Sequence, residues 1–170
     1  MLDDGALRAL AERLVAVPGL LGVMLGGSRA RGDHATDSDV DLGLYYRPPL
    51  DTIALRELAR SVATVQRLAE ARFLPGLLTK PARRANTTYV AGRLLRVVTL
   101  CAYAVHAQAG RWVINEKGIV DAADRLANAP EGFRQRAHGI LAQLGTEPRQ
   151  LLAAIAEAHV LVDAVETRVD

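Results

Sequence analysis

A length of 170 residues, half of them hydrophobic, suffices for one folded domain or two small ones and argues against a disordered chain. Aromatic residues make up only 4% of the chain, which argues against a stacking platform for single-stranded nucleic acid. The net charge is only +2, and because Lys80 and Lys117 are the only lysines, anionic ligands would be bound mainly by guanidinium groups.

The single cysteine and the hydropathy pattern indicate where the protein resides. Cys101 lies within an apolar run and is predicted to be a buried, unreactive thiol, and one cysteine alone excludes an intramolecular disulfide. The N-terminus is acidic and lacks the basic-then-apolar layout of a signal peptide. The most apolar stretch, residues 94–109, is interrupted by Arg96 and His106 and is too short to span a bilayer. These features predict a soluble, cytoplasmic protein with no membrane partner.

The first part of the chain predicts an alternation of helices and strands. Apolar residues recur at helical spacing over residues 7–15, and Pro18-Gly19 ends that helix. The apolar run 20–25, followed by Gly26-Gly27, predicts a buried strand and a tight turn. After a polar segment, residues 39–44 alternate polar and apolar side chains, which predicts a second strand.

From Asp51 onward the pattern is helical. An apolar stripe over residues 55–69 predicts a long helix that is broken at residues 73–76. Further helices are predicted over residues 82–109, 118–126, 131–144 and 149–169. The predicted fold class is α+β: a small αβαβα unit with an apparently truncated sheet in residues 1–78, followed by an all-α helical bundle in residues 79–170.

The turn after the first predicted strand has the composition of a phosphate-binding loop. Gly26 and Gly27 have no side chains, so a triphosphate can approach the backbone closely. Ser28 can donate its hydroxyl, and the amides that follow can open a helix N-terminus, which favours negative charge. Arg29 and Arg31 lie near enough in sequence to help neutralise phosphate oxygens.

Two aspartates on the second predicted strand indicate a metal site. Asp39 and Asp41 are two residues apart, so their side chains project from the same face of a strand. Two carboxylates so placed repel each other unless a cation lies between them. Mg²⁺ prefers one or two carboxylates with phosphate oxygens and water, and two such ions can lower the barrier of an in-line displacement at a nucleotide α-phosphate. A calcium loop is excluded, because the glycine and the distal glutamate of an EF-hand are absent.

In combination the two motifs resemble the nucleotidyltransferase superfamily of the DNA polymerase beta type, whose signature is an apolar strand, Gly-Ser and a downstream Asp-x-Asp. The stretches that match are residues 26–32 and 38–42. The resemblance implies that the glycine-serine turn holds a triphosphate and that the two aspartates bind the metal ions. The candidate nucleotide-binding residues are Gly26, Gly27, Ser28, Arg29, Arg31 and Ser38, and the candidate catalytic and metal-binding residues are Asp39 and Asp41.

The remainder of the chain is similar to a poorly characterised bacterial branch of these enzymes with a helical C-terminal domain. The similarity lies in residues 89–94 and 114–118. Kanamycin-type nucleotidyltransferases have the same general architecture. In such architectures the helical part closes over the substrate, which would bring Glu116 or Lys117 to the cleft. The alternative is that residues 115–118 form a helix-capping turn.

One expected feature is missing from the sequence. Active members of the superfamily use a third carboxylate on a later strand, where it binds metal and can act as a general base. The next acidic residues after the second strand are Asp51, Glu57 and Glu70, which lie at a helix start or on a helical stripe. By resemblance, the relatives have additional sequence near residues 76–84, as though a segment carrying a third strand had been lost here. Because a two-stranded sheet is marginal, strand pairing across a homodimer is a further hypothesis.

Two functions remain open. The first is Mg²⁺-dependent transfer of a nucleoside monophosphate, AMP from ATP, to a hydroxyl of a small molecule or a protein. The second is a degenerate nucleotidyltransferase that binds a nucleotide or a protein partner without turnover, as an antitoxin-like module does. The intact pair Asp39 and Asp41 favours the first function, and the missing third strand favours the second.

A nucleic-acid partner is the weakest interpretation. The helical RNases that often accompany such proteins use an arginine and a histidine on one helix. Arg134 and His138 are one residue too close for that pattern, and Arg96 and His106 are too far apart. The histidines are dispersed and no basic stripe with aromatic residues is present, so neither a metal cluster nor a nucleic-acid surface is indicated.

Overall fold

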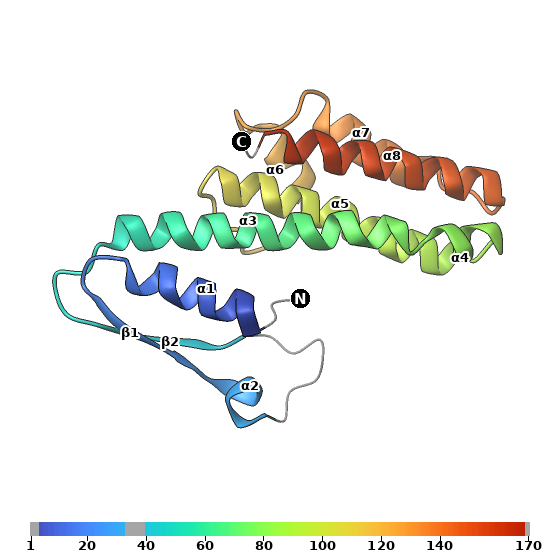
Figure 1. The fold of residues 1–170 in the computed structure, drawn as a ribbon. Helices are drawn as coiled ribbons and strands as arrows, with labels where there is room; N and C mark the ends of the chain where they lie inside the picture. The colour runs from blue at the N-terminus through green and yellow to red at the C-terminus, as the bar shows by residue number, and fades with distance from the viewer. Residues whose placement is uncertain (1–3, 33–39, 169–170) are drawn as a thin grey trace. The chain divides into compact units, whose positions relative to one another are not determined.

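The computed structural model describes residues 4–32 and 40–168 (Figure 1). The chain divides into two compact units, Met1–Ala59 and Arg60–Asp170, and the division falls inside helix α3 (Thr52–Gly76). The predicted domain boundary after residue 78 stays a prediction. The elements of the first unit are α1 (Asp4–Val15), β1 (Leu20–Leu25), α2 (Gly27–Arg31), β2 (Leu42–Tyr46) and the first turns of α3. This order confirms the predicted αβαβα unit.

The strands β1 and β2 form a two-stranded antiparallel sheet. Leu25, at the end of β1, pairs with Leu42, at the start of β2. The pairing continues for one residue beyond both strands, because the N–H of Gly26 donates to the carbonyl oxygen of Asp41 at 2.8 Å. Antiparallel pairing therefore brings the glycine turn next to the second aspartate of the Asp-x-Asp motif.

The sheet is less buried than its sequence predicts. Leu20 is 6% exposed, but Leu21 is 58% and Met24 is 50% exposed. The expectation of a buried first strand is wrong for these residues, because among the described residues the sheet has only two strands. Residues 4–32 and 40–168 contain no third strand.

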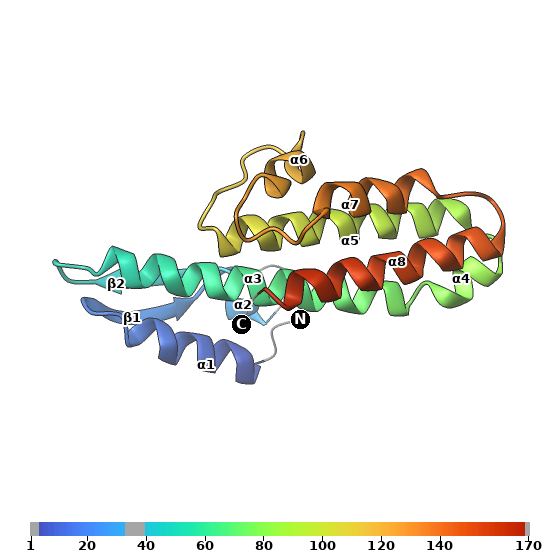
Figure 2. The ribbon, with the colours of Figure 1, turned by 90° about the horizontal axis from the view of Figure 1, so that it is seen from above.

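The second unit is an all-helical bundle, which confirms the fold class predicted for this part of the chain. Besides the later turns of α3 it contains α4 (Thr79–Arg83), α5 (Thr87–Gln108), α6 (Ile119–Asp124), α7 (Phe133–Ala142) and α8 (Pro148–Glu166). Figure 2 shows α5 lying alongside α7 and α8, which both pack against it. The core is centred on α5, where Leu94, Leu100 and Cys101 are fully buried.

Two predicted helix boundaries are corrected. The helix predicted to begin near residue 82 begins at Thr87, because Ala85 has a left-handed φ of +53° and the Asn86 side chain caps the new helix by accepting from the N–H of Tyr89. The break predicted at residues 73–76 falls after Gly76, so Pro75 lies inside α3. Pro75 lies in the last turn of the helix, and Leu74 next to it is buried in the core of the helical unit.

The composition of α5 reflects its position in the core. The stretch expected to be too short to cross a membrane belongs to α5, which by length and composition is long and apolar enough to do so. It is the one such helix among the described residues. Half of its most apolar window is nevertheless buried inside the helical unit. Burial in a protein core accounts for the apolar composition, and the absence of a membrane partner stays a prediction.

Candidate functional site

The glycine turn connects β1 to α2 at one end of the sheet (Figure 1). Gly26 is the N-cap of α2, with φ −113° and ψ −168°, and its carbonyl oxygen accepts from the N–H of Ala30 at 3.2 Å. Gly27 begins the helix with φ +62°, in the left-handed region that side chains other than glycine rarely adopt. The backbone therefore requires glycine at position 27 whatever ligand the turn binds.

The carboxylate of Asp41 occupies the space beside this turn. A Cβ atom added to Gly27 would lie 3.0 Å from Asp41 Cγ and would overlap Asp41 Oδ2. A Cβ atom added to Gly26 would lie 3.3 Å from Asp41 Cβ. The sequence suggested that the missing side chains make room for a triphosphate. On the Cβ side of both glycines, the structure shows that the room is taken by Asp41.

The remaining described residues of the motif lie on α2. Ser28 and Arg29 are half-buried and Arg31 is exposed. The two arginines lie in the last turn of this short helix, and Ser28 lies in its first turn. The start of α2 thus presents backbone N–H groups and the positive end of the peptide dipoles next to the Asp41 carboxylate.

The first aspartate of the motif cannot be placed beside the second. Asp39 and Ser38 lie outside the described residues, so the shared orientation of the two carboxylates stays a prediction. The strand predicted from residue 39 begins instead at Leu42, which puts Asp41 just before β2 rather than within it. Asp41 is exposed.

The described donor set is small but compatible with Mg²⁺. Residues 4–32 and 40–168 contain no group of three or more His, Cys, Asp or Glu side chains that could hold a metal ion. Mg²⁺ keeps several waters and commonly takes only one or two carboxylates together with substrate phosphates. An exposed carboxylate at the opening of a helix, with a second aspartate two residues earlier in sequence, fits that requirement.

In the helical unit, the segment before α6 has the geometry of a capping turn. Asn115 Oδ1 accepts from the N–H of Lys117 at 2.9 Å, and the Tyr103 hydroxyl donates to Glu116 Oε1 at 2.8 Å. The hydrogen bond to Glu116 raises the pKa of Tyr103 above its usual value. The turn therefore accounts for Asn115 and Glu116 structurally, and a role for Glu116 or Lys117 in substrate closure stays a prediction.

Arg134 and His138 converge on a carboxylate that the sequence did not single out. Arg134 Nε donates to Asp121 Oδ1, and His138 Nε2 lies 4.0 Å from the same oxygen. The hydrogen bond from Arg134 lowers the pKa of Asp121. Spacing along the sequence relates Arg134 to His138, but only the packing of α6 against α7 brings Asp121 to them.

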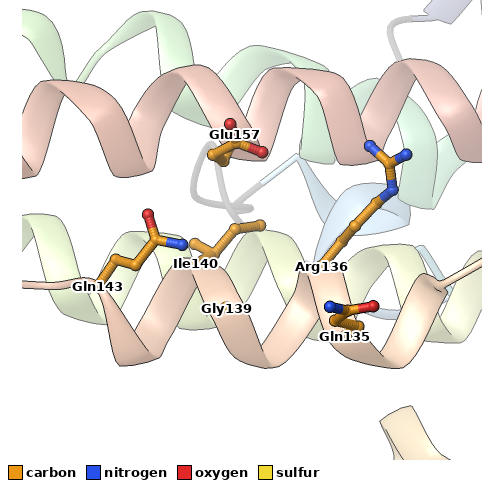
Figure 3. Close-up of a pocket in the computed structure, with 6 residues that line it drawn as sticks. All are labelled: Gln135, Arg136, Gly139, Ile140, Gln143 and Glu157. Carbon is orange, nitrogen blue, oxygen red and sulfur yellow. The ribbon is translucent and has the colours of Figure 1, made fainter.

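A separate open pocket of about 310 Å³ lies between α7 and α8. Figure 3 shows the residues that line it: Gln135, Arg136, Gly139, Ile140, Gln143 and Glu157. The lining contains one acidic and one basic side chain, and it includes neither the glycine turn nor Asp41. This pocket is therefore not the candidate catalytic site.

The comparison with protein families agrees with the geometry of the turn. Residues 7–78 match the family described as "Nucleotidyltransferase domain". This segment of the chain is therefore similar to nucleotidyltransferase domains, and the glycine turn and Asp41 lie within it. This match confirms the resemblance seen in the motifs and supports nucleotidyl transfer as the general activity. No curated protein and no solved structure matches the chain.

Proposed function

We propose that the protein transfers AMP from ATP to the hydroxyl of a small molecule or of a protein side chain. The observation that supports this reaction is the Asp41 carboxylate packed against the Gly27 turn, inside a segment that matches a nucleotidyltransferase domain. In the reaction the acceptor oxygen forms a bond to the α-phosphorus of ATP. The bond from that phosphorus to the pyrophosphate oxygen breaks, and the hydroxyl proton is released.

The motif residues divide this work between them. Asp41, together with Asp39, would hold Mg²⁺, which supplies positive charge to the phosphate oxygens of the transition state. The Ser28 hydroxyl and the first amides of α2 would donate to the triphosphate. Arg29 and Arg31 would neutralise its outer oxygens, with Ser38 as a further donor.

Degenerate nucleotide binding is the second candidate, and one specific observation favours it. The described residues form a sheet of two strands, so no later strand among them supplies a third carboxylate. A general base typically contributes about 10²–10⁴-fold to the rate, and its loss would leave slow transfer or binding alone. In that case the domain would act as a nucleotide-binding or antitoxin-like interaction module.

We also propose that the protein is a homodimer and that it is located in the cytoplasm. Each strand of a two-stranded sheet has an edge with unpaired backbone groups, which another strand can complete. We expect two copies of the chain to pair in this way, and a solution mass measurement that gives only monomer would contradict the dimer.

Labelled nucleotide separates the two candidate functions. The full chain would be incubated with ATP labelled at the α-phosphate, Mg²⁺ and candidate hydroxyl acceptors. Asp41→Asn and Asp39→Asn remove the proposed ligands, and Glu12→Gln changes an exposed carboxylate on α1 as the matched control. Transfer by the wild type and Glu12→Gln, but not by the aspartate variants, supports the enzyme. Binding without transfer supports the degenerate module, and equal transfer by all variants removes the enzymatic proposal.

A further inference from the structure

Two buried polar side chains in the helical unit each have a polar atom without a hydrogen-bond partner among the described residues. Thr64 on α3 and His106 on α5 are 2% and 8% exposed, and no other polar or charged side chain among the described residues is as deeply buried. Thr64 Oγ1 and His106 Nδ1 are both inaccessible to solvent, and neither has a partner in the described part of the chain. Folded proteins rarely leave buried polar atoms unmatched, because each costs the free energy of its lost hydration.

Contacts on either side of these residues define how α3 and α5 pair. A Cβ atom added to Gly110 would lie 2.6 Å from Arg60 Nη2, so the Arg60 guanidinium lies against the backbone that follows α5. The guanidinium carbon of Arg67 lies 5.2 Å from the centre of the Tyr103 ring. Lower numbers on α3 therefore meet higher numbers on α5. The two helices run antiparallel and side by side, as both Figure 1 and Figure 2 show.

This register places Thr64 opposite His106. Thr64 lies one helical turn after Arg60 and one turn before Arg67, and His106 lies one turn before Gly110 and one turn after Tyr103. Residues three or four apart share a face of a helix, so each side chain lies on the face that its neighbours use to reach the other helix. Thr64 Oγ1 and His106 Nδ1 therefore both lie in the buried contact between α3 and α5.

The hydrogen bond of His106 Nε2 determines whether His106 Nδ1 is a donor or an acceptor. His106 Nε2 lies 3.3 Å from the carbonyl oxygen of Ile119, the first residue of α6. A carbonyl oxygen can only accept, so Nε2 carries the hydrogen, and Nδ1 of the neutral ring is an acceptor. The Thr64 hydroxyl has a hydrogen to donate and lone pairs to accept. An acceptor and a hydroxyl that do not reach each other directly match the requirements of one water molecule.

We propose that one water molecule is bound between Thr64 and His106, donating to His106 Nδ1 and accepting from the Thr64 hydroxyl. The resulting chain of hydrogen bonds joins α3, α5 and α6, and it ends on the carbonyl that closes the segment between α5 and α6. That segment carries Trp112, which is 86% exposed and is the only tryptophan of the protein. The bound water thus ties the position of α3 to the anchoring of the Trp112 segment, independently of the proposed transferase activity.

The ring nitrogens of His106 give the most specific test. Nitrogen-15 NMR of the full chain at neutral pH is expected to show hydrogen on Nε2 and a hydrogen-bonded acceptor at Nδ1. In Thr64→Val, which keeps the shape of the side chain but lacks the hydroxyl, the Nδ1 resonance should shift. In Thr64→Ser, which keeps the hydroxyl, the resonance should stay near its wild-type position. Hydrogen on Nδ1 in the wild type would overturn the proposal.

Stability and crystallography provide two further readouts. Thr64→Val should lower the folding equilibrium constant roughly tenfold, since it leaves a buried acceptor incompletely matched. Thr99→Val is the matched control, because the Thr99 hydroxyl bonds the Leu95 carbonyl of its own helix at 2.9 Å. A crystal structure should show one water within hydrogen-bond distance of both atoms. A direct bond between them, a dry gap, or a Thr64→Val variant as stable as the control would contradict the water. If Thr64→Val does not fold, the nitrogen-15 spectra of the wild type and of Thr64→Ser still test the proposed water.

Discussion

The carboxylate of Asp41 lies against the backbone of Gly27, in the space that a side chain at position 27 would need. This contact follows from the antiparallel pairing of β1 with β2, which sets Gly26 opposite Asp41. The glycine turn and Asp41 are therefore held next to each other by the sheet itself. A substitution in the turn should therefore displace the carboxylate of Asp41, the proposed metal ligand.

Alanine substitutions at two glycines separate backbone strain from displacement of Asp41. Gly27 and Gly32 have φ of +62° and +78°, but a Cβ atom on Gly32 would meet nothing within 4 Å. Gly32→Ala should cost only the left-handed strain, about 1–2 kcal/mol of unfolding free energy. Gly27→Ala should cost more and should also weaken binding of Mg²⁺–ATP, as measured by denaturation and titration calorimetry. Equal losses of stability with unchanged ATP binding would show that the contact with Asp41 is irrelevant to the nucleotide.

The start of α3 depends on a side-chain cap. Asp51 Oδ1 accepts from the N–H groups of Ile53 and Ala54 at 3.0 and 2.9 Å. Asp51→Ala should therefore lower the unfolding free energy by about 1 kcal/mol, whereas Asp51→Asn should retain most of it, because asparagine is an equally good cap. Urea denaturation of both variants measures the difference. An alanine variant as stable as the asparagine variant would refute the cap.

Periodicity and turn residues predicted the order of the elements, because helical and strand spacing are local properties of the chain. Periodicity and turn residues gave wrong predictions of burial and of helix ends, because those depend on tertiary packing. The apolar run of β1 could not reveal that Leu21 and Met24 would be exposed, since that depends on how many strands the sheet contains. Pro75 did not end α3, which runs on to Gly76, and the buried Leu74 next to it belongs to the core of the helical unit.

The candidate site shows the same limit. The glycine turn and the Asp-x-Asp motif could be found from residue types and spacing alone. That the Asp41 carboxylate lies on the Cβ side of Gly27 depends on strand register, which spacing does not give. The position of Thr64 opposite His106 likewise depends on the register between α3 and α5, which are far apart in sequence.

The Cys101 thiol should react only when the helical unit unfolds. The side chain is fully buried, and burial raises the pKa of the thiol to about 12. At pH 8 a disulfide reagent should label native protein far more slowly than a small free thiol, and the labelled fraction should follow the unfolding curve in denaturant. Rapid, complete labelling in native buffer would contradict the core described for α5.

The ion pair between α6 and α7 should weaken in acid. The hydrogen bond from Arg134 lowers the pKa of Asp121 from 3.8, so the folded state holds this carboxylate ionised more strongly than the unfolded chain does. The stabilisation is therefore complete above the unfolded pKa and is lost as the pH falls through the folded pKa. Carbon-13 NMR titration of the carboxyl group should show the pKa of Asp121 moving back towards 3.8 in Arg134→Gln. Arg136→Gln, on the same helix, should leave it unchanged, and an equal effect of both variants would contradict the specific pairing.

The central claim, that Asp41 at the glycine turn binds a metal–nucleotide complex, is tested most directly by calorimetric titration of the full chain with ATP. The titration is run with Mg²⁺ and again with a chelator, on the wild type, Asp41→Asn and Glu12→Gln. We expect binding by the wild type and Glu12→Gln only when Mg²⁺ is present, and affinity at least tenfold weaker, about 1.4 kcal/mol, in Asp41→Asn. Equal binding by Asp41→Asn and the wild type, or wild-type binding that does not depend on Mg²⁺, would contradict the claim.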